Sequence, residues 1–80
     1  MKDEPAEFTQ TYNLYLKGEL SKAYDLITSV CDLYPAWQGR AYEIRFNLAA
    51  MMGKLELAED ILKQALDLGF FYNDFVLRRD

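Results

Sequence analysis

Two arginines and an asparagine, Arg40, Arg45 and Asn47, are the residues of this chain best suited to binding chemistry. A guanidinium group presents a planar fork of N–H donors that matches the two oxygens of a carboxylate. These side chains are therefore candidates for holding an acidic group of a partner. The alternative is that the arginines only balance the charge of the acidic helices beside them.

The sequence offers little chemistry for catalysis. It contains no histidine, and its single cysteine, Cys31, cannot build a zinc site alone. The four glycines are isolated, so no phosphate-binding loop is present. We expect no enzymatic activity, no metal and no cofactor. Cys31 is either a reactive thiol or a small core residue, and its position on an apolar stripe favours the core.

Composition limits the class of protein and of partner. Eighty residues make one domain at most, and a hydrophobic content of 51% argues against disorder. Nine basic and 13 acidic residues give a net charge of -4, which argues against nucleic acid as a partner. No signal-like start or membrane-length apolar run occurs. We expect a soluble, cytoplasmic chain.

Apolar periodicity predicts an all-α fold of two antiparallel hairpins and a short terminal helix, without strands. The third segment carries two apolar lines, so we expect it to pack on both sides, with Trp37 opening one core line. In the fourth, Glu59 and Lys63 have the spacing of an ion pair. The expected helices cover about Pro5–Lys17, Leu20–Leu33, Ala36–Met52, Lys54–Leu68 and Asp74–Arg79.

The pattern Gly-x-Leu-x-x-Ala occurs twice, beginning at Gly18 and at Gly53, 35 residues apart. A period of this length is typical of repeated helical hairpins. With Ala23, Ala58 and Pro35 at the expected places, the chain resembles the tetratricopeptide repeat family. The resemblance divides the single domain 1–80 into repeats of about 5–35 and 36–69 and a capping helix of about 73–79. Pentatricopeptide repeats share the period, but the acidic balance disfavours RNA.

The resemblance also implies a binding surface. In tetratricopeptide repeats the first helix of each hairpin lines a groove, where Lys, Arg and Asn hold an acidic peptide or a terminal carboxylate. Arg40 and Asn47 fall near those positions, and Asn13 is the candidate in the first repeat. A full carboxylate clamp is absent, because the first repeat has no matching Lys-Asn pair.

The aromatic tail after Gly69 suggests further contacts. Its rings either cover the core or form a surface for self-association or docking; they are Phe70, Phe71, Tyr72 and Phe75. This segment resembles the end of bacterial tetratricopeptide modules, some of which precede an α/β-hydrolase domain. A homodimer or an inter-domain contact would complete the small core.

These observations lead to one main hypothesis and two alternatives. The main hypothesis is a non-catalytic scaffold that binds a protein or peptide through the groove and binds neither nucleic acid nor membrane. The first alternative is an N-terminal accessory module of a larger bacterial enzyme such as an α/β-hydrolase. The second is a self-associating assembly unit.

Overall fold

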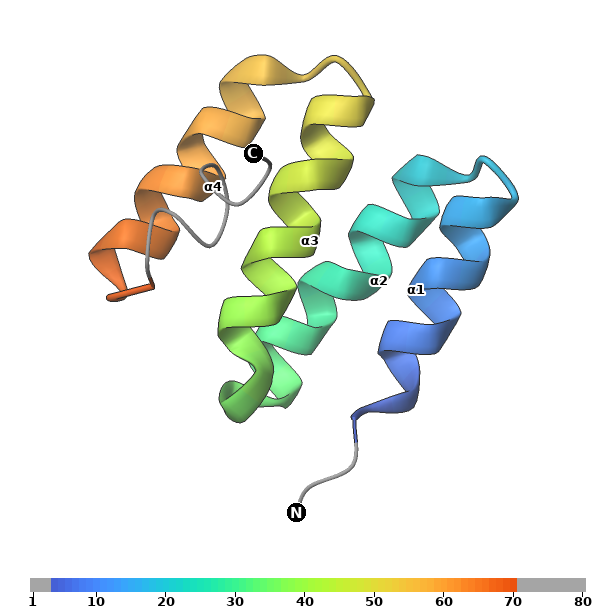
Figure 1. The fold of residues 1–80 in the computed structure, drawn as a ribbon, viewed down its shortest axis with the longest axis horizontal. Helices are drawn as coiled ribbons and strands as arrows, with labels where there is room; N and C mark the ends of the chain where they lie inside the picture. The colour runs from blue at the N-terminus through green and yellow to red at the C-terminus, as the bar shows by residue number, and fades with distance from the viewer. Residues whose placement is uncertain (1–3, 71–80) are drawn as a thin grey trace, which may run out of the picture.

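The computed structural model describes residues 4–70, and this part of the chain is all-α, as expected. Four helices follow one another, each packed on the next (Figure 1). They are α1 (Ala6–Leu16), α2 (Leu20–Leu33), α3 (Gln38–Met51) and α4 (Leu55–Asp67), with a 3₁₀ turn, η1 (Pro35–Trp37), before α3. The expected terminal helix and the tail from Phe71 lie outside the described residues.

The turns after α1 and α3 have the same backbone geometry. Gly18 and Gly53 adopt φ values of 80° and 76°, a region that other residues enter only with strain. The next amide in each turn bonds back into the helix, from Glu19 to the Leu14 carbonyl and from Lys54 to the Ala49 carbonyl, both at 2.9 Å. This is the Schellman arrangement, which satisfies the last carbonyls of a helix. The Gly-x-Leu-x-x-Ala pattern thus marks two matching helix ends.

The third helix begins later than the sequence predicts. Pro35 opens η1 after Tyr34, whose backbone is extended at φ -133° and ψ 81°, and the α-helix starts only at Gln38. The side-chain Nε2 of Gln38 donates to the Cys31 carbonyl at 2.8 Å and satisfies one free acceptor at the end of α2. Trp37 packs against the core from η1, and its ring lies 5.5 Å from that of Phe8. The short turn therefore fixes the start of α3 against both α1 and α2.

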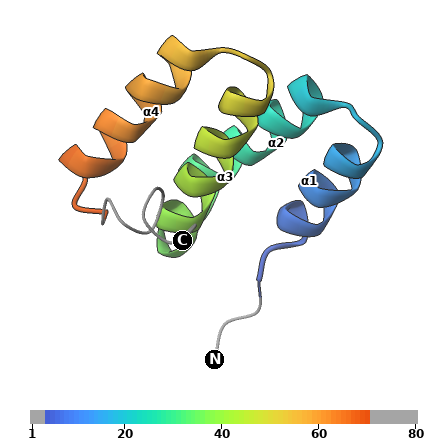
Figure 2. The same cartoon turned by 45° about the horizontal axis from the view of Figure 1, so that its top comes forward.

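Small residues allow the helices to approach closely. The alanines of the repeated pattern are buried, with Ala23 fully covered and Ala58 4% exposed. Branched side chains fill the space between the helices, and burying each fully contributes about 1.5–3 kcal/mol. The largest of them are Ile27, Val30 and Ile61. α3 contacts both α2 and α4, so the expectation that this helix packs on two sides is confirmed (Figure 2).

Candidate partner-binding groove

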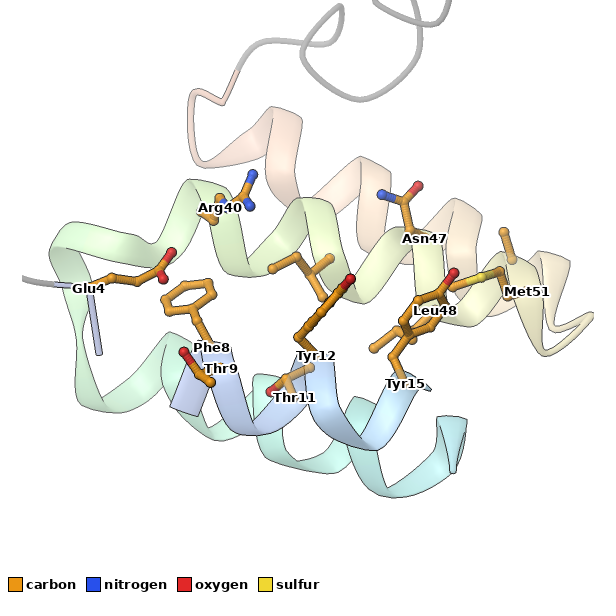
Figure 3. A pocket seen from close by; sticks show the side chains of 12 residues that line it. Glu4, Phe8, Thr9, Thr11, Tyr12, Tyr15, Arg40, Asn47, Leu48 and Met51 are labelled. Carbon is orange, nitrogen blue, oxygen red and sulfur yellow. The ribbon is translucent and has the colours of Figure 1, made fainter. Parts of the chain in front are cut away.

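A groove of about 700 Å³ runs between α1 and α3 (Figure 3). It forms because both helices pack on α2 while making few contacts with each other. Twelve residues from both sides line it: Glu4, Phe8, Thr9, Thr11, Tyr12, Tyr15, Arg40, Ile44, Asn47, Leu48, Ala50 and Met51. A volume of this size is typical of ligand sites in proteins.

The lining of the groove is mostly apolar. Phe8 and Leu48 are buried core residues that also line this space. Tyr12 is 58% exposed and Met51 49%, although both are large hydrophobic residues. The rings of Tyr12 and Tyr15 lie 6.1 Å apart and tilted by 33°. Exposed aromatic rings beside an apolar surface are a common feature of surfaces that bind partners.

One end of the groove carries charge. Glu4 and Arg40 lie at this end, and Figure 3 shows both near the Phe8 ring, at the end of the groove away from Tyr15 and Met51. Arg40 forms an ion pair with Glu43 of its own helix at 3.9 Å, and its side chain remains 57% exposed. An exposed pair at this distance contributes little to stability. The guanidinium group can therefore exchange Glu43 for an acidic group of a partner.

The structure brings together two of the four predicted binding residues. Arg40 and Asn47, two helical turns apart, both line the groove, whereas Asn13 is exposed on α1 outside the lining. Arg45 points to a different side of α3. Five residues correspond to about 140° of rotation on an α-helix, so Arg40 and Arg45 cannot share one face.

Arg45 instead joins α3 to α2. One of its terminal nitrogens donates to the Tyr24 hydroxyl at 3.3 Å, and the other lies 3.8 Å from the Cys31 sulfur. The guanidinium carbon is 5.6 Å from the Tyr24 ring centre and 5.0 Å from that of Tyr42, which indicates cation–π contacts. Its Nε is buried without a hydrogen-bond partner among residues 4–70. This arginine has a structural role between two helices.

Cys31 is a core residue, as the apolar stripe indicates. The thiol is 6% exposed, and burial raises its pKa, while the nearby Arg45 guanidinium opposes that rise. The thiol is therefore neutral at pH 7 and a weak nucleophile.

Tyr12, Tyr15 and Met51 are groove residues that the sequence reasoning did not identify as binding residues. Tyr12 lies four residues after Phe8, at helical spacing, but the buried face of α1 contains Phe8 and Thr11 and leaves Tyr12 exposed. Thr11 is tolerated there because its hydroxyl donates to the Glu7 carbonyl at 2.7 Å. The sequence did contain a signal for such exposed residues, because α1 has more large apolar residues than one buried face can hold.

The first residue of the tail, Phe70, lies within the described part of the chain. Phe70 is half-buried, and its ring lies 5.6 Å from that of Tyr42. It also faces Gly39, where an added Cβ would lie 3.4 Å from the ring. Phe70 therefore covers the core of its own chain. Phe71, Tyr72 and Phe75, the other residues of the predicted docking surface, lie outside the described part.

Comparisons with known proteins correct the expected family. The family model described as "A/B hydrolase-like, N-terminal domain" matches residues 6–80. The prediction of a tetratricopeptide repeat protein is therefore wrong. The pattern that suggested it reflects two Schellman turns and two close helix contacts, which are common where helices are joined by tight turns. No curated protein and no solved structure matches the chain.

The match agrees with the first alternative from the sequence, an N-terminal module of an α/β-hydrolase-like protein. Concerning membranes, none of the helices described between residues 4 and 70 is long and apolar enough to cross a bilayer.

Proposed function

Because the chain belongs to the family of A/B hydrolase-like N-terminal domains, we propose that it is a non-catalytic helical module that works with an α/β-hydrolase domain. The family match over residues 6–80 carries this proposal. The absence of histidine from the sequence supports a non-catalytic role, because a Ser-His-Asp triad cannot be built without it. The hydrolytic residues would then belong to another part of the protein.

The groove between α1 and α3 is the surface through which the module would hold its partner. Its apolar lining suits a segment with apolar side chains, and the exposed aromatic rings suit contacts that bury large areas. Arg40 at the charged end suits an acidic group on that segment, while Asn47 supplies a donor and an acceptor. The partner segment is therefore apolar with an acidic residue near one end.

The first experiment is to sequence the reading frame that encodes this chain, with its neighbours, and to search it for an α/β-hydrolase domain. The residues 1–80 and the hydrolase part are then produced separately. Hydrolysis of p-nitrophenyl acetate is measured for each part, for their mixture and for the intact protein.

We expect residues 1–80 alone to give the background rate and the hydrolase part to need them for full activity or stability. Hydrolysis by residues 1–80 alone would show that the module is catalytic. A hydrolase part whose rate and melting temperature do not depend on residues 1–80 would contradict a joint function. A gene region without any hydrolase domain would remove the basis of the proposal.

The role of Arg40 is tested by the salt dependence of complex formation. If Arg40 holds an acidic group, Arg40→Gln should weaken the complex by about 1 kcal/mol and reduce the sensitivity to salt. The matched control is Lys22→Gln, which removes an exposed positive charge from a similar i,i+3 ion pair, with Glu19, outside the groove. Equal effects of the two substitutions would mean that only net charge matters.

A further inference from the structure

Helices α2 and α4 occupy equivalent places in the chain. Each follows a Schellman turn, at Gly18 and at Gly53, and each buries an alanine five residues after that glycine. A shift of 35 residues therefore aligns the two helices. The aligned pairs are Leu20 with Leu55, Tyr24 with Glu59, Ile27 with Leu62, and Cys31 with Leu66.

The aligned positions differ in what covers them. On α2, Ile27 is fully buried and Cys31 is 6% exposed, and the side chain of Arg45 from α3 contacts both Tyr24 and Cys31. On α4, Leu55 is 69% exposed and Leu66 42%, and Leu62 is half-buried. We refer to Leu55, Leu62 and Leu66 as the α4 stripe. Among residues 4–70, no helix follows α4 to cover this stripe as α3 covers α2.

The charge on the α4 stripe indicates the chemistry of its partner. Glu59 stands where α2 has Tyr24, the residue that receives the hydrogen bond and the cation–π contact of Arg45. Glu59 is exposed and forms no ion pair within the described part of the chain, so the pair with Lys63 expected from the sequence is not formed. A helix that covers α4 as α3 covers α2 would thus place a cationic side chain opposite Glu59.

The length of the stripe limits the source of that helix. Leu55 to Leu66 spans about 16 Å along the helix axis, which about a dozen helical residues would cover. The chain passes from α2 to α3 through Tyr34 and η1, so a connecting turn is needed as well. Residues 71–80 of this sequence number ten. Ten residues are too few for both the connecting turn and a helix that covers the whole stripe.

We propose that the α4 stripe is a second docking surface, which receives an amphipathic helix from the α/β-hydrolase part of the protein. That helix has an apolar face of aliphatic side chains and an arginine or lysine that pairs with Glu59. The inference rests on the proposed function and adds a second contact surface, separate from the groove between α1 and α3.

Alkylation of an introduced thiol tests this proposal. Leu66→Cys places the thiol on the stripe, and the matched control Gln64→Cys places one at an exposed position on the opposite side of α4. Each variant is labelled with iodoacetamide, as the 80-residue chain and as the protein that includes the hydrolase part. Mass spectrometry of peptides separates the introduced thiol from the buried Cys31.

We expect the thiol at position 66 to react freely in the 80-residue chain and about tenfold more slowly in the larger protein. The thiol at position 64 should react equally in both. Adding Glu59→Lys should restore most of the reactivity at position 66, because like charges then face each other. A Glu59→Gln variant should have an intermediate effect.

Equal reactivity at position 66 in both proteins would overturn the proposal even if the hydrolase part depends on residues 1–80, so this failure is separable from that of the proposed function. Slow alkylation of the thiol at position 66 already in the 80-residue chain would also overturn the proposal. Sedimentation would then tell whether a second copy or residues 71–80 cover the stripe, since only the former gives a dimer.

Discussion

Arg45 of α3 donates a hydrogen bond to the Tyr24 hydroxyl of α2 at 3.3 Å, and its guanidinium carbon lies 5.6 Å from the centre of the same ring. The contact joins α2 to α3 on either side of the turn η1. Arginine remains charged throughout the accessible pH range. The rings of Tyr24 and Tyr42 stabilise this charge through cation–π contacts, and no carboxylate between residues 4 and 70 is involved. The Arg45 Nε has no hydrogen-bond partner among the described residues, so the two terminal nitrogens and the contacts with the two rings hold this side chain.

Replacing Arg45 by lysine should lower the free energy of unfolding by about 1–2 kcal/mol. Lysine keeps the charge and can donate, but it has no planar guanidinium to stack on two rings and no second terminal nitrogen to reach both Tyr24 and Cys31. The measurement is urea unfolding followed by circular dichroism. Arg40→Lys, in the exposed ion pair, is the control and should change stability by less than about 0.5 kcal/mol. Equal losses for both arginines would contradict a special role for Arg45.

Gly18→Ala and Gly53→Ala should each lower stability by about 1 kcal/mol or more. Nothing lies within 4 Å of a Cβ added at either position, so the cost comes from the positive φ alone. Asparagine at the same positions should cost less, because it tolerates this region better. Thermal unfolding of the two alanine variants and their double variant checks this, and the effects should add, since the two turns end different helices, α1 and α3.

Substitutions at Gly39 should reveal the contact with Phe70. An alanine Cβ would meet the Phe70 ring at 3.4 Å, an ordinary contact distance, so Gly39→Ala should be close to neutral. Gly39→Leu would displace the ring and should cost about 1–3 kcal/mol. In a Phe70→Ala background that cost should largely disappear. A leucine penalty that persists there would show that Phe70 is not the residue displaced.

Cys31 should make stability depend on pH in the alkaline range. Burial raises the folded-state pKa above the ordinary value of 9.0, so the folded chain keeps the proton that the unfolded chain begins to release near that pH. The stabilising contribution is complete below the unfolded pKa and is lost as pH rises toward the folded one. The stability of the native chain relative to Cys31→Ala should therefore fall above about pH 9. A constant difference between the two chains would contradict this.

Most of the fold could be predicted from the sequence because its signals are local. Gly18, Gly53 and Gly69 end helices, and apolar residues at helical spacing identify the buried faces of α2 and α4. The start of α3 was predicted too early because Pro35 is compatible with both a 3₁₀ turn and an α-helix. The family was predicted wrongly because the same turn chemistry serves many helical hairpins.

The site was less predictable, because a groove depends on the spacing between helices. Arg40 and Asn47 were identified, but Arg45 was grouped with them although rotation along α3 separates their faces. Tyr12 and Met51 have large apolar side chains of the kind found in cores, and only the gap between α1 and α3 leaves them exposed. A single sequence does not record that distance.

The measurement that tests the proposed function most directly is calorimetric titration of the hydrolase part with the 80-residue chain and its Met51→Glu variant. This substitution places a charge in the apolar groove without touching the buried core. Leu33→Glu, at a 60% exposed leucine on α2 outside the groove, is the matched control. We predict that the native chain binds and that Leu33→Glu has little effect on binding. Met51→Glu should raise the dissociation constant by about tenfold or more, which corresponds to about 1.4 kcal/mol. No binding by the native chain, or equal binding by both variants, would contradict the proposed role of the groove.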